Sequence, residues 1–224
     1  EKLLNLGTIR RLSFNQCKGF FITFLDTDDY WVEFKLEKQV KRFQENNKID
    51  VLYSNYFTNV NQKIEKKTKH LFKGYCQSKI IESYINGSPL TAWLTLMIKK
   101  NSIEKLEYSF DNKTHISSDF DLIIRLSNFS NFDYLDDYLA YYRVHEDNES
   151  KNTKEEINEL IYILNKFSIN KKLQKIFGYK NYLFKIYIKY FIQKKYENDL
   201  NKNFYLVNNK KIKIIYLIFK ILPK

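Results

Sequence analysis

Glycine, proline and cysteine are all scarce in this chain of 224 residues, which has five, two and two of them. So little glycine and proline excludes collagen-like and low-complexity chains. The two cysteines, Cys17 and Cys76, are too few for a disulfide framework and lack the spacing of metal ligands. We therefore predict that both are buried free thiols in a reducing compartment.

Long hydrophobic runs are absent too. No apolar stretch reaches the length of about 18 residues that a transmembrane helix needs, and the first residues lack the pattern of a signal peptide. Hydrophobic residues make up 44% of the chain and charged residues 29%, which is close to the globular average and excludes wholesale disorder. We therefore expect a folded, cytoplasmic protein.

Positive charge is concentrated at the C-terminal end. The net charge is +12, and residues 155–224 supply most of it with 15 lysines and five acidic residues. A basic tail on a near-neutral body indicates an anionic partner, and a solvated basic surface is the alternative. Nucleic acid is disfavoured as that partner, because the lysines lie among Ile, Leu and Tyr and not in an arginine stripe.

Residues 209–224 combine lysines with an apolar helical face. Ile214, Leu217, Ile218 and Ile221 fall on one side of a helix, and lysines gather toward its two ends. The segment is too short and too charged to span a bilayer, but it suits an interfacial helix on anionic headgroups. We therefore expect peripheral binding to the inner face of the plasma membrane. Packing of this helix on the rest of the chain is the alternative.

Strands and helices alternate up to about residue 150. We predict strands over 20–25, 49–57, 93–98 and 139–144, helices over 32–46, 77–85 and 119–129, a short helix from 101, and a loop or exposed hairpin over 58–70. This alternation predicts an α/β fold with a mostly parallel sheet. The later pattern is helical, over 155–168, 181–196 and 209–222. The predicted domains are therefore 1–150 and a basic helical appendage over 151–224.

Three carboxylates, Asp26, Asp28 and Asp29, follow the first predicted strand. In open α/β sheets, ligands bind beyond the carboxyl ends of the strands. Clustered oxygen ligands suit Mg²⁺ or Mn²⁺, which in turn bridge phosphate oxygens. The alternative is a surface turn in which Asp28 or Asp29 caps the next helix.

Two further segments carry candidate chemistry. Asp119 and Asp121 open the helix predicted over 119–129, where either a general base or a simple interaction with the helix dipole explains them. Ser117 or Ser118 is the expected N-cap of that helix. His145 ends the strand predicted over 139–144; it is either structural or a partner for a metal and a phosphate.

The sequence around these residues resembles the family 2 glycosyltransferases of GT-A fold. The similar segments are Gly19–Trp31 with its Asp-x-Asp motif, Lys35–Gln39, Ile49–Tyr56, Thr95–Lys100, Phe110-Asp111, Ile116–Leu122, and Leu139–His145 followed by Asn148 and Ser150. They follow the family's order and spacing over about residues 5–150. The resemblance implies a Rossmann-like GT-A domain whose first strands precede this chain.

The resemblance implies transfer of a sugar, usually with inversion, from a nucleotide-sugar donor to an acceptor hydroxyl. The acceptor would be a glycan or a lipid-linked intermediate in the synthesis of lipopolysaccharide, capsule or a similar cell-surface glycan. A truncated or degenerate transferase without catalysis, or a protein that only binds anions or membranes, is the alternative.

The resemblance also implies a role for individual residues on the donor side. Asp26 would meet the nucleotide ribose, and Asp28 would hold Mn²⁺ or Mg²⁺ with Asp29 beside it. Arg10 would join the donor site. His145 would approach the metal or the diphosphate.

On the acceptor side, Asp119 would deprotonate the acceptor hydroxyl for attack on the anomeric carbon. Ser118 stands where the family has a glutamate immediately before this base. We therefore expect the acceptor side of the site to be altered or weakened relative to the family.

Overall fold

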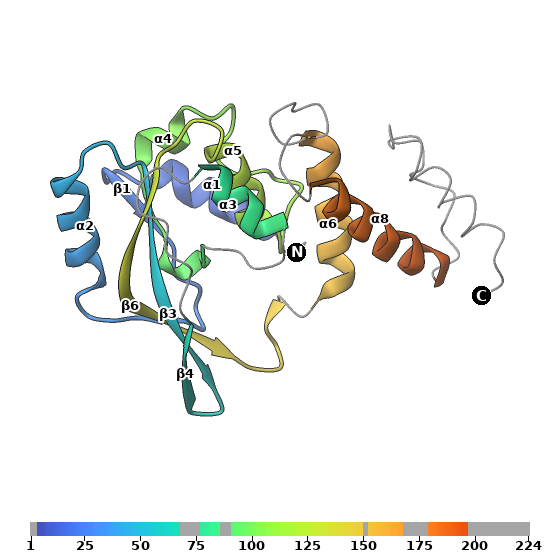
Figure 1. Cartoon of the computed structure of the whole chain (residues 1–224), viewed down its shortest axis with the longest axis horizontal. Coiled ribbons are helices and arrows are strands. Elements are labelled where there is room, and N and C mark those ends of the chain that lie inside the picture. Colours follow the sequence, from blue (N-terminus) through green and yellow to red (C-terminus); the bar gives the residue numbers. More distant parts are fainter. Residues whose placement is uncertain (1–3, 68–76, 86–90, 150–151, 168–178, 197–224) are drawn as a thin grey trace. The chain divides into compact units, whose positions relative to one another are not determined.

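The computed structural model describes residues 4–67, 77–85, 91–149, 152–167 and 179–196 (Figure 1). The chain divides into two compact units, the first ending at Lys151 and the second beginning at Asn152.

A six-stranded sheet forms the centre of the first unit (Figure 1). Its order is β1 (Phe21–Thr23), β5 (Met97–Lys99), β3 (Val51–Val60), β6 (Phe132–Val144) and β2 (Tyr30–Trp31), with β4 (Lys63–Lys67) paired to β3. Among the described strands, β3 and β6 are the one parallel pair, and the other pairings are antiparallel.

The expectation of a mostly parallel sheet is therefore wrong for these strands, although the unit is a mixed α/β structure. Parallel neighbours require long crossover connections, and alternation alone does not guarantee them. The hairpin of β3 and β4 turns at Asn61 and Gln62, whose φ angles of 48° and 67° are those of a type I′ turn. Such a tight turn allows only antiparallel pairing.

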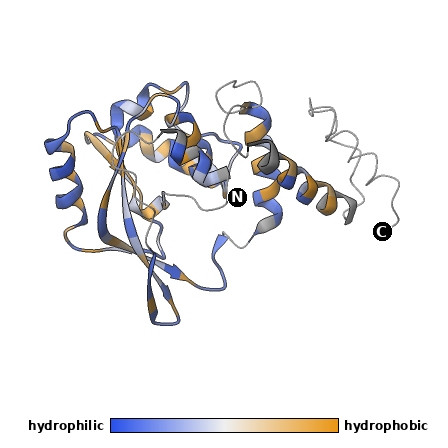
Figure 2. Ribbon diagram, in the orientation of Figure 1, coloured by the Kyte–Doolittle hydropathy of each residue, from blue (hydrophilic) through white to orange (hydrophobic). Residues whose placement is uncertain are grey.

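Helices cover both faces of the sheet. On one face, α1 (Leu6–Gln16), α3 (Gln77–Ile85), α4 (Lys100–Glu104) and α5 (Ser118–Leu126) supply residues to the larger core cluster. On the other face, Phe43 of α2 (Lys35–Glu45) packs with Ile49, Leu52 and Met97. Successive side chains of β3 point to opposite faces of the sheet, so this strand contributes to both clusters. In Figure 2, β1 is hydrophobic, whereas α2 carries many hydrophilic residues.

Two predicted strands differ from the structure. Residues 93–98 begin as a 3-10 helix, Trp93–Thr95, and only then enter β5. The strand predicted over 139–144 is the end of the longer β6. The first half of β6 contains acidic residues, which are unfavourable in strands. Basic side chains from another part of the fold form ion pairs with them. Asp133 pairs with Arg42 at 2.7 Å, and Asp137 pairs with Lys38 at 2.5 Å.

Cys17 is a free thiol just beyond α1. It is half-buried and packs against the larger core cluster, so the prediction of full burial is wrong for this residue. The reason is its place at the C-cap of a helix with a largely exposed outer side. Cys76 lies outside the described residues.

The second unit contains α6 (Thr153–Phe167) and α8 (Tyr179–Tyr196), which pack on each other. The hydroxyl of Tyr187 donates a hydrogen bond of 2.5 Å to Oδ1 of Asn165 across the pair. None of the helices in the described part of the chain combines the length and the apolar composition that spanning a bilayer requires. The segment 209–224 lies outside the described residues.

Candidate active site

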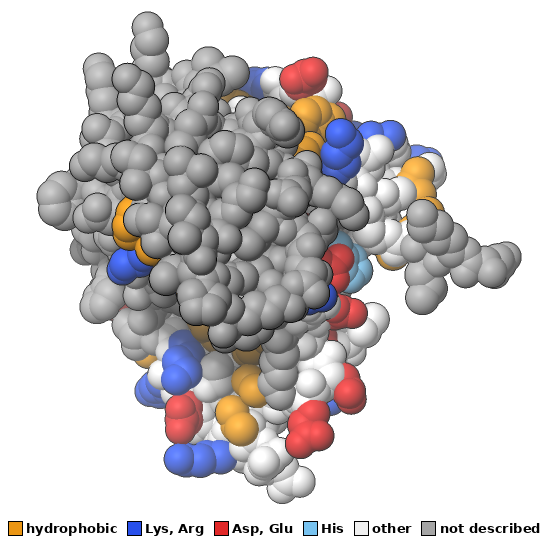
Figure 3. All heavy atoms as spheres, turned by 90° about the vertical axis from the view of Figure 1, so that its right-hand side faces the viewer, with side chains coloured by type: hydrophobic (Ala, Val, Ile, Leu, Met, Phe, Trp, Pro, Cys, Tyr) orange, Lys and Arg blue, Asp and Glu red, His pale blue; other side chains and the backbone are white. Residues whose placement is uncertain are grey.

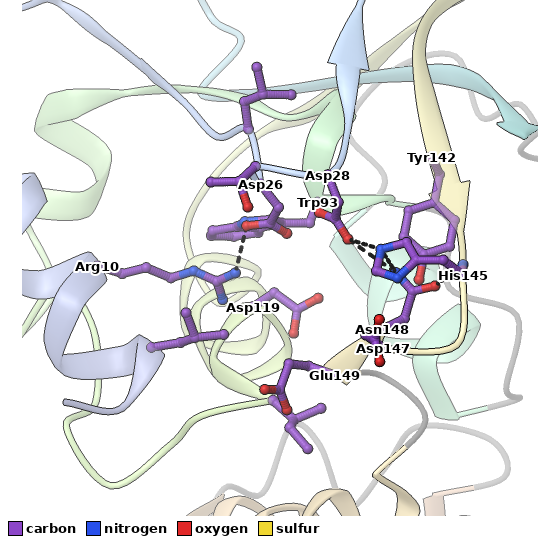
Figure 4. A pocket seen from close by; sticks show the side chains of 14 residues that line it. Arg10, Asp26, Asp28, Trp93, Asp119, Tyr142, His145, Asp147, Asn148 and Glu149 are labelled. Carbon is purple, nitrogen blue, oxygen red and sulfur yellow. Dashed lines mark hydrogen bonds and ion pairs between the residues drawn. The ribbon is translucent and has the colours of Figure 1, made fainter. Parts of the chain in front are cut away.

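One cavity of about 580 Å³ gathers most of the predicted site residues (Figure 4). Its lining includes Arg10, Asp26, Asp28, Asp119 and His145. They come from α1, the loop after β1, the start of α5 and the segment after β6. Residues from four distant parts of the sequence therefore meet in one place.

A turn after β1 presents two of the three acidic residues to the cavity. The backbone N–H of Asp29 donates to the carbonyl oxygen of Asp26 at 3.1 Å, which closes the turn. Asp29 itself does not line the cavity; it is buried, and its Oδ1 accepts the backbone N–H of Arg143 at 2.9 Å. Burial raises the pKa of Asp29 to about 6, against the opposing effect of that hydrogen bond. Asp29 thus links the loop to β6.

A buried lysine supports the same loop from behind. Lys35 is fully buried, and its Nζ donates to Oε1 of Gln39 at 2.7 Å and to Oγ1 of Thr23 at 3.1 Å. The same Nζ lies 4.3 Å from the ring centroid of Trp31. Thr23 and Trp31 stand on either side of the acidic loop, so Lys35 ties its two ends to α2. Burial lowers the pKa of Lys35 to about 7.

Asp28 is bound by two side chains from beyond β6 (Figure 4). Its Oδ2 lies 2.9 Å from Nε2 of His145 and 3.1 Å from Nδ2 of Asn148. Asn148 follows the similar segment Leu139–His145, but the sequence predicted no role for it. Asparagine is common in turns for local reasons, so a partner of Asp28 cannot be told from a turn residue by sequence alone.

Arg10 lies between the acidic loop and α5. Its Nη2 is 3.4 Å from Oδ1 of Asp26, its Nη1 donates to Oγ of Ser118, and its guanidinium lies 4.4 Å from the ring centroid of Trp93. The N-cap of α5 is Ser117, and its side chain makes no capping hydrogen bond to the helix. Ser118 thus serves as a partner of Arg10.

The position of Arg10 depends on a close approach of α1 to the loop before α5. The backbone N–H of Gly7 donates to the carbonyl oxygen of Thr114 at 3.0 Å. A Cβ at position 7 would lie 2.4 Å from that oxygen and 2.1 Å from the carbonyl oxygen of Asp111. Only glycine allows this contact, and Arg10 follows one turn later on the same helix.

Asp119 and Asp121 have different surroundings. Asp119 lines the cavity, and burial raises its pKa while the charge of Arg10 opposes the rise. Asp121 is fully buried, and its Oδ2 accepts Nε of Arg125 at 2.8 Å. Arg125 also donates to the carbonyl oxygens of Tyr108 and Ser109. Asp121 is therefore part of a structural ion pair, and Asp119 is the carboxylate available to a substrate.

The residues fit a cation that is shared with a nucleotide. Across the described ranges, no group of three or more His, Cys, Asp or Glu side chains is placed to hold a metal ion. Mg²⁺ in nucleotide sites needs only one or two protein ligands, because phosphates and water complete its shell, and Mn²⁺ prefers similar ligands. The carboxylate of Asp28 matches that requirement, and Nε2 of His145, 2.9 Å from Oδ2 of Asp28, is close enough to bind the same cation. In the view of Figure 3, acidic side chains lie beside a histidine at the surface.

The sequence is similar to known glycosyltransferases. Residues 2–106 match the family model described as glycosyl transferase family 2. The chain is 32% identical over 197 residues to the uncharacterized glycosyltransferase MJ1057 of Methanocaldococcus jannaschii, covering 86% of this chain and 66% of the relative. It is 28% identical over 152 residues to WfaP of Escherichia coli, a UDP-Glc:alpha-D-GlcNAc-diphosphoundecaprenol beta-1,3-glucosyltransferase, covering 66% of this chain and 55% of the relative. The chain thus spans between about half and two thirds of the length of these relatives.

The fold is similar to crystal structures of S. aureus TarS. One of them aligns with a TM-score of 0.52 at 16% identity, covering 96% of this chain and 39% of TarS. A structure of a shorter part of TarS aligns with a TM-score of 0.50 at 16% identity, covering 84% of this chain and 60% of that structure. Residues 2–106 therefore belong to a family 2 glycosyltransferase domain, and the first unit has the GT-A fold of that family.

Proposed function

We propose that the protein is an inverting glycosyltransferase that moves a sugar from a nucleotide-sugar to an acceptor hydroxyl during synthesis of a cell-surface glycan. One observation carries this proposal: a single cavity contains Asp26, Asp28 and His145 for the donor together with Asp119 for the acceptor. A protein that only binds anions has no need of a partly buried carboxylate beside such a donor site.

The donor side is assigned from the contacts of the acidic loop. The carboxylate of Asp26 accepts hydrogen bonds from the hydroxyls of the nucleotide ribose. Arg10 lies beside this carboxylate and orients it. Asp28 and His145 hold Mn²⁺ or Mg²⁺. When bound, the cation neutralises the negative charge that develops on the leaving diphosphate.

The acceptor side is assigned to Asp119. The oxygen of the acceptor hydroxyl attacks the anomeric carbon from the side opposite the diphosphate, so a new glycosidic bond forms as the bond to the phosphate oxygen breaks. The proton of that hydroxyl passes to Asp119. A carboxylate with a raised pKa is a stronger base for this step than an ordinary one.

The substrates are proposed from the named relative. WfaP is named for transfer from UDP-Glc to a diphosphoundecaprenol-linked GlcNAc. We accordingly assign a UDP-sugar donor and a lipid-linked glycan acceptor to this protein. The lysines and the apolar face of residues 209–224 support peripheral binding to the anionic inner leaflet, which would bring the enzyme to such an acceptor.

The proposal is tested by UDP release. The protein is incubated with UDP-sugars and an undecaprenyl-diphosphate-linked acceptor, with Mn²⁺ or with EDTA. We expect release that depends on Mn²⁺ and on the acceptor, and that falls in Asp119→Asn. UDP binding without any turnover would favour the degenerate transferase, and absence of Mn²⁺-dependent UDP binding would contradict the donor site.

A further inference from the structure

Asn148 joins three parts of the site. It is buried, with 8% of its surface exposed, and follows β6 by four residues. Its Oδ1 accepts the backbone N–H of His145 at 2.7 Å. Its Nδ2 lies 3.1 Å from Oδ2 of Asp28 and 3.2 Å from the carbonyl oxygen of Arg143. One amide therefore connects the end of β6, the turn that carries His145 and the acidic loop.

The backbone contact decides which way the amide of Asn148 points. A backbone N–H can only donate, so the atom that faces the N–H of His145 must be the amide oxygen. The amide nitrogen must then face Asp28. Its two N–H groups match the two oxygens within reach, one from Asp28 and one from Arg143. Asn148 thus offers Asp28 a donor and is not itself a metal ligand.

His145 reaches the same oxygen of Asp28. Its Nε2 lies 2.9 Å from that oxygen and 3.2 Å from Nδ2 of Asn148, so the three polar atoms form a compact triangle. The turn from His145 to Asn148 depends on the amide as well, because Asn148 Oδ1 is the acceptor for the His145 N–H. Loss of the amide would release the carboxylate of Asp28 and the backbone of His145 together.

We propose that Asn148 is a positioning residue, which holds Asp28 and His145 at the mutual distance that a divalent cation requires. This rests on the proposed function, in which those two residues hold the cation. Partners of metal ligands fix the orientation of the ligands, and their loss typically lowers metal affinity about 10–100-fold. A residue that only closes a turn would instead affect stability and leave metal affinity unchanged.

The chain offers a matched control for this distinction. Asn55 on β3 is also a buried asparagine whose Nδ2 donates to a carboxylate, Oδ1 of Asp136, at 2.8 Å. It does not line the cavity. Asn55→Ala therefore removes a comparable buried amide away from the site.

The test compares Mn²⁺ binding by the wild-type chain, Asn148→Ala and Asn55→Ala in the presence of UDP. Free Mn²⁺ is measured by its electron paramagnetic resonance signal, at a temperature where circular dichroism shows all three proteins folded. We expect Mn²⁺ affinity to fall about tenfold or more in Asn148→Ala and to stay within about twofold in Asn55→Ala.

Two results would overturn the inference in different ways. Equal Mn²⁺ affinity in Asn148→Ala and the wild type would contradict the role of Asn148 but not the metal site. No Mn²⁺ binding by the wild type would remove the metal site and the role together. Should Asn148→Ala fail to fold, Asn148→Ser carries the same expectation, because its hydroxyl is too short to reach Asp28.

Discussion

Asp28 and His145 are 117 positions apart in the sequence, yet Oδ2 of the first and Nε2 of the second are 2.9 Å apart. The parallel pairing of β3 with β6 and the pairing of β2 with the far end of β6 produce this proximity. The contact between Asp28 and His145 therefore depends on the sheet as a whole.

Asp28→Asn should abolish Mn²⁺-stimulated turnover and leave the fold intact. The amide that replaces the carboxylate is neutral and is a poor ligand for a hard cation. Turnover is measured as UDP release with increasing Mn²⁺, and the fold by circular dichroism. If the variant is active and its turnover does not depend on Mn²⁺, the assignment of Asp28 as a metal ligand is wrong.

Asp119→Asn should lower kcat by about 10²-fold or more and leave donor affinity nearly unchanged, since only the general base is lost. Steady-state kinetics and UDP titration separate the two quantities. A variant with wild-type kcat would contradict the role of Asp119. The neighbour Ser118 binds Arg10, so Ser118→Ala tests whether the orientation of Arg10 affects the base.

Asp121→Asn should act on stability and not on chemistry. It breaks a buried ion pair and leaves Arg125 without its charged partner, which typically costs about 3 kcal/mol or more. Urea unfolding measures the loss, and the same substitution at Asp119 is the control. A fall in kcat without a fall in the free energy of unfolding would show that Asp121, and not Asp119, serves the reaction.

Lys35→Met should change how stability depends on pH. The folded pKa of Lys35 is about 7, below its ordinary value of 10.5, so between these values the unfolded chain binds more protons at this residue. The destabilisation by Lys35 is complete below about pH 7 and disappears as pH rises toward 10.5. Its contribution to the free energy of unfolding therefore increases by up to about 1.4 kcal/mol per pH unit in this window.

Urea titrations at several pH values across that window measure the slope. Lys35→Met should remove the part that Lys35 contributes. Lys38→Met is the control, because Lys38 lies on the same helix but forms a partly exposed ion pair with Asp137. An identical pH dependence in the wild type and Lys35→Met would contradict the lowered pKa.

Residues 209–224 should hold the protein on anionic vesicles. Each lysine near such a surface contributes about 1 kcal/mol, and salt screens the attraction. Flotation with vesicles of anionic phospholipid should show binding that weakens with salt and is lost when the segment is deleted. Absence of binding at every salt concentration would reject the anchor.

The local sequence pattern was sufficient to predict several helices and strands, but it was not sufficient to predict the whole of β6. α3 is predicted at its observed bounds, because its apolar spacing and the following turn are both local signals. The first half of β6 is not predicted, because Asp133 and Asp137 are unfavourable in a strand by local pattern alone. In the fold they form ion pairs with Arg42 and Lys38 of α2. Partners from distant segments decide such cases.

The same reasoning applies to the site. Asp26, Asp28, Asp119 and His145 belong to ordered motifs, so the resemblance found them and the fold brings them to one cavity. Asn148 follows one of the similar segments, but its role could not be predicted, because its contact with Asp28 exists only after β6 is formed.

Gly7 shows how little mutational tolerance this arrangement leaves at a position that does not line the cavity. Even one methyl group at residue 7 would collide with two backbone oxygens, so α1 would have to withdraw from the loop at 111–114. Arg10 would withdraw with it, away from Asp26 and Ser118. A search for variants of altered donor preference should therefore leave residue 7 untouched and vary the rim of the cavity.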